Sequence, residues 1–174
     1  MKKIVIIING RGGVGKDTLC SFISRYYKTI NVSAITPIKQ MASCYGWNGE
    51  KDEKSRRFLS ELKRVFIEYN DLPNQYLVAE YKKFLDDDNM IMFVHIREKD
   101  QISKFIESVG GHCITLLVRS NIFGSTNFIY RNYSDDNVED YTYDYYYDNN
   151  KPLELAEKDF FDFFNMILNS EHVI

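Results

Sequence analysis

A glycine-rich run near the start of the chain has the residue types and the spacing of a polyphosphate site. The run reads GRGGVGKDT and consists of Gly10, Arg11, Gly12, Gly13, Val14, Gly15, Lys16, Asp17 and Thr18. Glycines let a tight turn point successive main-chain N–H groups at phosphate oxygens. A helix that begins there adds its dipole, and Lys16 adds a point charge for the β- and γ-phosphates. We predict that this loop binds a nucleoside triphosphate.

The loop matches seven positions of the P-loop (Walker A) motif G-x-x-x-x-G-K-[ST] and departs from it at the eighth. Asp17 stands where a Ser or Thr hydroxyl usually ligates Mg²⁺, and the hydroxyl comes one residue later, at Thr18. A carboxylate can hold Mg²⁺ directly or through water. The candidate metal ligands here are therefore Asp17 and Thr18, and the Thr18 hydroxyl has a second candidate role as a donor to the α-phosphate.

Two other interpretations of the loop are weaker. A glycine-rich turn can bind nothing, but four glycines and a lysine between a strand and a helix make that interpretation improbable. The spacing Gly10-x-Gly12-x-x-Gly15 also fits a dinucleotide-binding fingerprint. Lys16 would intrude there, and no acidic residue closes a second strand about 20 residues further on.

The rest of the chain predicts the elements that must position this loop. Continuous apolar runs at 3–9, 90–94 and 113–118 are typical of strands buried on both faces, and 31–35 and 143–147 are weaker strands. Helices are expected at 16–27, 37–44, 54–69, 73–85, 99–109 and from 153 onward. Strands alternating with helices predict a single three-layer α/β/α domain over residues 1–174, with a parallel sheet of about five strands.

Amphipathic spacing predicts which face each helix buries. In the helix 54–69, the apolar residues at 3.6-residue spacing are Phe58, Leu62, Val65, Phe66 and Tyr69. We expect this face to pack against the rest of the domain.

The composition of the chain argues against a nucleic-acid partner and against a membrane-spanning segment. The 174 residues are 44% hydrophobic with a net charge of −3, which suits a folded domain and gives no reason to expect a nucleic-acid partner. No run approaches the roughly 18 apolar residues of a membrane span. Three cysteines without CxxC spacing suit reduced thiols in the cytoplasm better than zinc or disulfides. The sequence leaves the oligomeric state open, with a homodimer as one option.

The GKDT ending of the loop resembles that of bacteriophage-type deoxynucleoside monophosphate kinases and their uncharacterised bacterial relatives. The order of predicted elements is similar to the nucleoside monophosphate kinase fold over most of the chain. This resemblance implies transfer of the γ-phosphoryl group of ATP, with Mg²⁺, to a (deoxy)nucleoside monophosphate. It also implies a helical acceptor-binding region at about 37–86 and a lid at about 119–141.

Phosphoryl transfer depends on positioning and on neutralising charge, so the candidate catalytic groups are cations. Besides Lys16, the resemblance implies that Arg97, just after the apolar strand, holds the acceptor phosphate. It implies that Arg119 and Arg131 meet the phosphates when the lid closes.

Further candidates lie in the predicted acceptor region and beside Arg97. Arg56 and Lys63 are seven residues apart on one helix face and could hold the acceptor phosphate, although a solvated basic face explains them equally well. Lys39 is a weaker candidate of the same kind. Glu98 is a third candidate Mg²⁺ ligand, and His95 is more often a packed histidine than a catalytic one.

Two alternatives stay open at this point. Other P-loop small-molecule kinases, such as animal-type phosphomevalonate kinase, have a similar loop ending, so the acceptor could be dephospho-coenzyme A or an isoprenoid phosphate. A non-catalytic nucleotide-binding module is favoured by one absence: no aspartate stands at the end of the run 90–94, where many P-loop enzymes hold Mg²⁺ through water.

Overall fold

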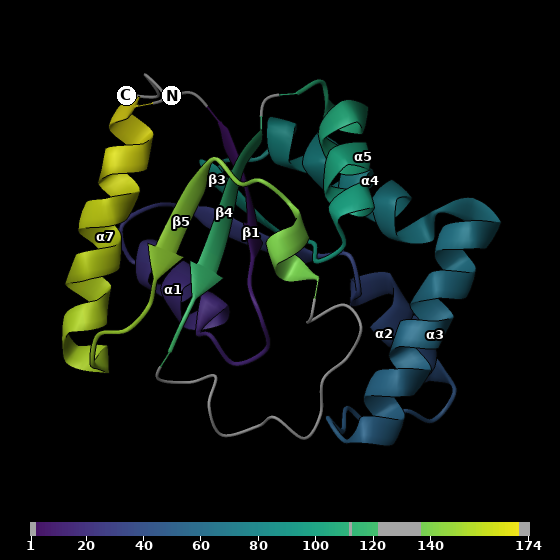
Figure 1. Cartoon of the computed structure of the whole chain (residues 1–174). Coiled ribbons are helices and arrows are strands. Elements are labelled where there is room, and N and C mark those ends of the chain that lie inside the picture. Colours follow the sequence, from purple (N-terminus) through teal and green to yellow (C-terminus); the bar gives the residue numbers. More distant parts are fainter. Residues whose placement is uncertain (1–2, 112, 122–136, 171–174) are drawn as a thin grey trace.

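Five parallel strands form one sheet in the order β2–β3–β1–β4–β5 (Figure 1). The computed structural model describes residues 3–111, 113–121 and 137–170. The strands are β1 (Ile4–Asn9), β2 (Thr29–Ser33), β3 (Ile91–His95), β4 (Cys113–Arg119) and β5 (Tyr145–Asp148). The parallel α/β fold and its five strands, predicted from the sequence, are confirmed.

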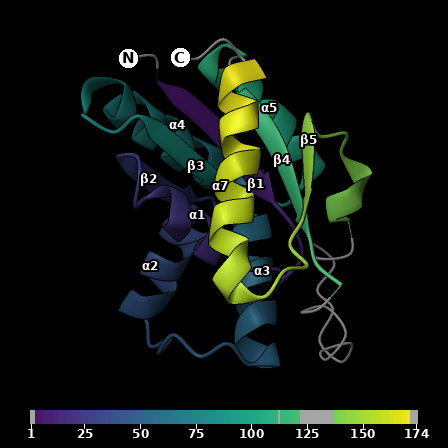
Figure 2. The same ribbon diagram turned by 90° about the vertical axis from the view of Figure 1, so that its left-hand side faces the viewer.

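Helices cover both faces of the sheet. They are α1 (Lys16–Ile23), α2 (Thr36–Cys44), α3 (Glu53–Asn70), α4 (Leu72–Asp86), α5 (Lys99–Val109) and α7 (Leu153–Ser170), with a 3₁₀ turn η1 (Val138–Asp140). Side chains alternate along a strand, so Ile6 of β1 packs with α1 and α7, whereas Ile7 packs with α4 and α5. Figure 2 views the sheet from the α7 side. This arrangement is the three-layer fold that the alternating elements predict.

The sheet topology places a ligand site at the end of β1. β1 lies between β3 and β4, with Ile6 opposite Phe93 on one side and Ile114 on the other. The chain therefore leaves the centre of the sheet in opposite directions, to β2 and β3 on one side and to β4 and β5 on the other. In open parallel sheets ligands bind in the crevice at such a point, outside the carboxyl ends of the strands. The glycine-rich loop follows β1 at this position.

Helices α2 and α3 form a smaller unit beside the carboxyl ends of the strands (Figure 1). Their shared core has three buried side chains, Ile38, Ala42 and Leu59. The predicted buried face of α3 is confirmed only in part: Leu62 and Phe66 pack against this core, whereas Phe58, Val65 and Tyr69 are 45%, 49% and 79% exposed. α3 instead turns its neighbouring stripe inward, since its partners are α2 and α4 rather than the sheet.

Smaller differences concern element ends and thiols. α1 ends at Ile23, four residues before the predicted end, and β2 begins two residues earlier than expected. Cys20 is buried and Cys113 half-buried, and burial raises the pKa of both thiols, whereas Cys44 at the end of α2 is exposed. Among the described residues, no helix has the length and apolarity that a bilayer crossing requires.

Candidate functional site

The glycine-rich loop has a backbone that only glycine accommodates easily. Gly10, Gly13 and Gly15 have φ angles of 147°, 84° and 91°, a range that side chains disfavour. A Cβ on Gly10 would lie 2.3 Å from the carbonyl oxygen of Val118. A Cβ on Gly15 would lie 2.6 Å from Asn149 Nδ2. The loop is thus pressed against the ends of β4 and β5.

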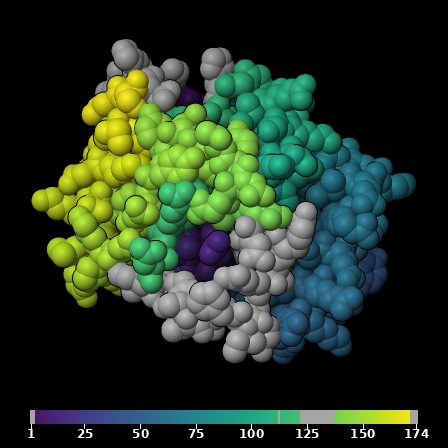
Figure 3. Space-filling view, viewed as in Figure 1, coloured from purple at the N-terminus to yellow at the C-terminus, as the bar shows by residue number. Residues whose placement is uncertain are grey.

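The helix that follows the loop begins without a side-chain cap. Gly15 is the N-cap residue of α1, and as a glycine it has no side chain that could cap the helix. Main-chain N–H groups at a helix start carry partial positive charge and attract anions. Figure 3 shows the N-terminal segment exposed in a hollow bordered by the green segments near the end of β4 and η1. The amide donors and the hollow together suit a phosphate chain.

Lys16 lies across this loop. Its Nζ donates hydrogen bonds to the carbonyl oxygens of Gly10, at 2.6 Å, and Arg11, at 3.0 Å. The ammonium group is therefore held over the turn by main-chain acceptors from the opposite side of the loop. A phosphate bound to the loop amides would meet this charge.

A buried asparagine joins the loop to its neighbours. Asn9, fully buried at the end of β1, accepts a hydrogen bond from Gly10 N at 2.8 Å through its Oδ1. Its Nδ2 donates to Arg97 O at 3.0 Å and to Tyr143 Oη at 2.7 Å. The Tyr143 hydroxyl donates in turn to Val138 O at 2.8 Å. Every hydrogen-bonding atom of the Asn9 amide and the Tyr143 hydroxyl proton has a partner, which fixes the loop, the end of β3 and η1 relative to one another.

The end of β3 carries His95 and Arg97 next to the loop. Burial lowers the pKa of His95 to about 4; Asp17 opposes this shift, and Lys16 and Arg97 add to it. These charges therefore lie close enough to His95 to act on its titration, and the predicted role of Arg97 in acceptor binding stays a prediction. His95 Nε2 lies 3.3 Å from Asn31 Oδ1, and the ring is neutral at pH 7.

Lys63 and Glu98, predicted as separate ligands, are partners. Lys63 Nζ lies 2.6 Å from Glu98 Oε2, and the Lys63 side chain is only 10% exposed. Burial would raise the pKa of Glu98, but the attraction and hydrogen bond of Lys63 outweigh it and leave that pKa below its usual value. Acceptor binding by Lys63 and Mg²⁺ binding by Glu98 stay predictions.

Arg119 lies at the end of β4 and pairs with a residue that the sequence analysis did not select. Its Nη2 lies 2.5 Å from Glu139 Oε2, and its guanidinium lies 4.8 Å from the centroid of the Tyr146 ring. Arg119 lowers the pKa of Glu139 against the effect of burial, and Arg11 of the loop contributes to the lowering. Glu139 therefore lies near both arginines. Arg131 and most of the predicted lid lie outside the described residues.

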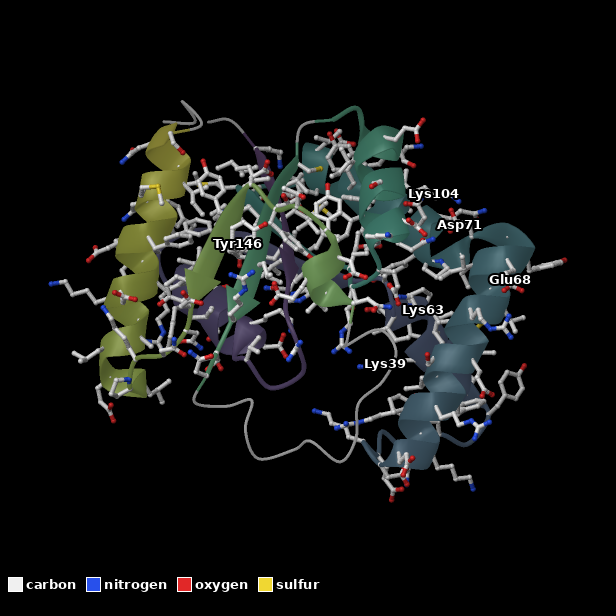
Figure 4. The ribbon with its side chains drawn as sticks, viewed as in Figure 1. Lys39, Lys63, Glu68, Asp71, Lys104 and Tyr146 are labelled. Atoms are coloured by element: carbon white, nitrogen blue, oxygen red, sulfur yellow. The ribbon has the colours of Figure 1, made fainter. Side chains whose placement is uncertain are left out.

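The other predicted acceptor residues are exposed. Arg56 lies near the start of α3, and Lys39 lies on α2. Figure 4 shows Lys39 directed from α2 toward the side of the molecule that holds the glycine-rich loop. Acceptor binding by Lys39 and by Arg56 stays a prediction.

A cavity of about 390 Å³ adjoins the loop on the side of α1 and α7. It is lined by Gly13, Gly15, Thr18, Leu19, Phe22, Asn149, Lys151, Leu153 and Ala156. Its walls are largely apolar side chains, and its mouth meets the loop glycines. The residues 149–153 were missed from sequence, although their place after β5 at the carboxyl edge of the sheet was a signal that could have selected them.

The donors at the start of α1 suit Mg²⁺. Asp17 and Thr18 are both exposed beside the loop and offer a carboxylate and a hydroxyl oxygen. In the part of the chain that the structure describes, no group of three or more His, Cys, Asp or Glu side chains could hold a metal ion by itself. Mg²⁺ commonly takes one or two protein ligands together with phosphate oxygens and water, and Mg²⁺ binding by Asp17 and Thr18 stays a prediction.

Comparison with protein-family models and with curated protein sequences finds no match for this chain.

Proposed function

We propose that this protein is a small-molecule kinase that transfers the γ-phosphoryl group of ATP to a (deoxy)nucleoside monophosphate. The observation that carries the proposal is the loop itself. Its left-handed glycines follow the central strand, open an uncapped helix and lie under the Lys16 ammonium group. That combination of amides, dipole and charge suits a polyphosphate better than any other ligand.

The cavity beside the loop supports a nucleotide as the phosphoryl donor. Its apolar walls, including Leu19, Phe22 and Leu153, suit the faces of a base, and its edge at Gly13 and Gly15 suits the phosphates. A nucleotide lying across this edge would place its β- and γ-phosphates on the loop, with its base between α1 and α7.

The acceptor would approach from the opposite side of the loop. The main-chain carbonyl of Arg97 accepts a hydrogen bond from Asn9, which places this residue beside the loop, and Lys39 faces the same side from α2. Two cations opposite Lys16 would hold the acceptor phosphate and neutralise charge as the phosphoryl group moves. Arg119 lies at the rim, where exchange of its Glu139 partner for a phosphate would draw it inward.

Asp17 and Thr18 would hold Mg²⁺, which when bound would supply positive charge to neutralise the charge that develops on the phosphates. Asp17 would hold the ion directly or through water, and Thr18 would lie beside it. Asp17→Asn is therefore expected to raise the Mg²⁺ concentration needed for half-maximal rate about tenfold, measured by Mg²⁺ titration at saturating ATP. An unchanged titration would return Asp17 to a structural role at the helix start.

The deciding experiment incubates purified protein with ATP, Mg²⁺ and each of the common ribo- and deoxyribonucleoside monophosphates. ADP release that depends on one or more acceptors supports the proposal. Release with dephospho-coenzyme A or an isoprenoid phosphate alone would keep the kinase chemistry and change the acceptor. ATP binding with no acceptor-dependent ADP would contradict the proposal and favour a nucleotide-binding module.

A further inference from the structure

The Lys63–Glu98 ion pair links helix α3 to the start of helix α5. Lys63 lies in the middle of α3, whereas Glu98 is the N-cap residue of α5 and directly follows Arg97. Their side chains are 10% and 32% exposed, and the N–O distance is 2.6 Å. Figure 4 shows Lys63 directed from α3 toward the neighbouring elements rather than into solvent.

The other ion pairs of α3 itself differ in kind. Arg57–Glu61 and Arg64–Glu68 link residues four apart on the same helix, and their side chains are 60% to 80% exposed. Such pairs contribute little to tertiary structure. Lys63, one residue from Arg64, is turned inward and contacts a different element.

A second ion pair links the same elements at the other end. Asp71, at the junction of α3 and α4, lies 2.6 Å from Lys104 of α5. Figure 4 shows the two side chains meeting between these helices. The apolar core shared by α2 and α3 has three buried side chains among the described residues, with partly buried Leu62 and Phe66 of α3 packed against them. The two ion pairs add to this attachment and tie the α3 side to α5.

We propose that the Lys63–Glu98 pair is a latch that holds α3 against the carboxyl end of β3 and so sets the distance between the acceptor-binding helices and Arg97. A partly buried charge left without its partner is strongly unfavourable. The pair therefore favours one defined position of α3. Lys63 is then a positioning residue: its ammonium group is committed to Glu98 and acts on the acceptor through Arg97. This role rests on the proposed function.

The test compares Lys63→Met with Arg64→Met, since both variants remove one cation from the same helix. Glu98→Gln and the charge-exchanged double variant K63E/E98K complete the set. Hydrogen exchange measured by mass spectrometry reports how firmly α3 is held. Steady-state kinetics with whichever monophosphate supports ADP release in the experiment above report KM for the acceptor and for ATP separately.

Lys63→Met and Glu98→Gln are expected to raise hydrogen exchange in α3 and to raise the acceptor KM about tenfold with the ATP KM unchanged. The double variant should recover part of both effects, and Arg64→Met should change neither. Exchange that rises without a change in acceptor KM would reduce the pair to a stability contact and overturn the proposal.

Unchanged exchange in Lys63→Met would also overturn the latch. A rise in acceptor KM that K63E/E98K does not reverse would contradict the latch and indicate that Lys63 binds the acceptor directly. If no acceptor supports turnover, the proposed function fails while the exchange data remain decisive: exchange that rises in both single variants and recovers in the double variant supports the latch, and any other pattern contradicts it.

Discussion

The loop side and the α2–α3 side of the site are built in different ways. The loop stands on a sheet with 19 buried residues in the core on its α1–α7 face, and Asn9 ties it to its neighbours by buried hydrogen bonds. The apolar core shared by α2 and α3 is smaller, with three buried side chains among the described residues and partly buried ones around them, and ion pairs add to its attachment. Local stability follows buried apolar contacts. The loop is therefore expected to be the more firmly held of the two regions, whereas the position of α3 depends more on its ion pairs.

The largest expected effect tests the loop side. Lys16→Ala should lower phosphoryl transfer by about 4 kcal/mol of transition-state stabilisation, roughly 10³-fold in kcat, because a charge aimed at the transferred group is lost. Lys28→Ala, which removes an exposed cation paired with Asp88, is the control and should leave kcat unchanged. Wild-type transfer by Lys16→Ala would show that the loop is not the phosphate site.

Two matched isoleucine-to-alanine substitutions compare the stability of the sheet core with that of the α2–α3 core. Ile8 and Ile38 are both fully buried, in the sheet core and the α2–α3 core respectively. Ile8→Ala should lower the free energy of unfolding by about 3–4 kcal/mol. Ile38→Ala should instead accelerate hydrogen exchange mainly in α2 and α3. Equal acceleration in β1 and α3 for both variants would show that the two sides unfold as one unit.

The neutral histidine beside the loop predicts a pH dependence. The pKa of His95 is about 4 in the folded protein and about 6.5 in an unfolded chain. Between these values the unfolded chain takes up a proton that the folded protein does not. Stability should therefore fall as the pH falls from about 6.5 to 4, by about 3 kcal/mol.

The histidine contribution is isolated by replacing it. His95→Asn should flatten this part of the stability profile in urea unfolding measured at several pH values. A profile with the same slope in His95→Asn would assign the pH dependence to other groups.

The smallest expected changes in stability come from two glycine substitutions, which distinguish backbone strain from close contact at the loop. Gly111→Ala, with a φ of 87° and open space around it, should cost about 1 kcal/mol from backbone strain alone. Gly10→Ala adds a contact of 2.3 Å with the Val118 carbonyl oxygen and should cost about 2 kcal/mol or more. Gly10→Ala should also weaken ATP binding in calorimetry, and Gly111→Ala should not. Equal ATP affinities would contradict the close fit of the loop.

The sheet could be predicted from sequence because its signals are local. Apolar runs such as IVIII and MFV predict buried strands by themselves, and the loop motif fixes which strand it follows. The buried face of α3 could not be predicted in this way. Phe58, Val65 and Tyr69 belong to the regular apolar stripe but are exposed, whereas Leu59 and Lys63, which lie outside that stripe, are buried.

The candidate site was predictable in part for the same reason. The loop residues are contiguous, so their spacing could be recognised. The partners of Asn9, Glu98 and Arg119 lie 134, 35 and 20 residues away, and nothing local to either residue specifies such pairs. Asn149, which lines the cavity, was missed because its role depends on where β5 ends against the loop.

The distribution of thiols offers a practical probe of movement in the α2–α3 unit. Reaction with maleimides requires an accessible thiolate, and burial suppresses it. Cys44 is exposed at the end of α2, whereas Cys20 is buried and Cys113 half-buried. A fluorophore would therefore attach first at Cys44, and the unaltered chain already carries a reporter on its less firmly held side.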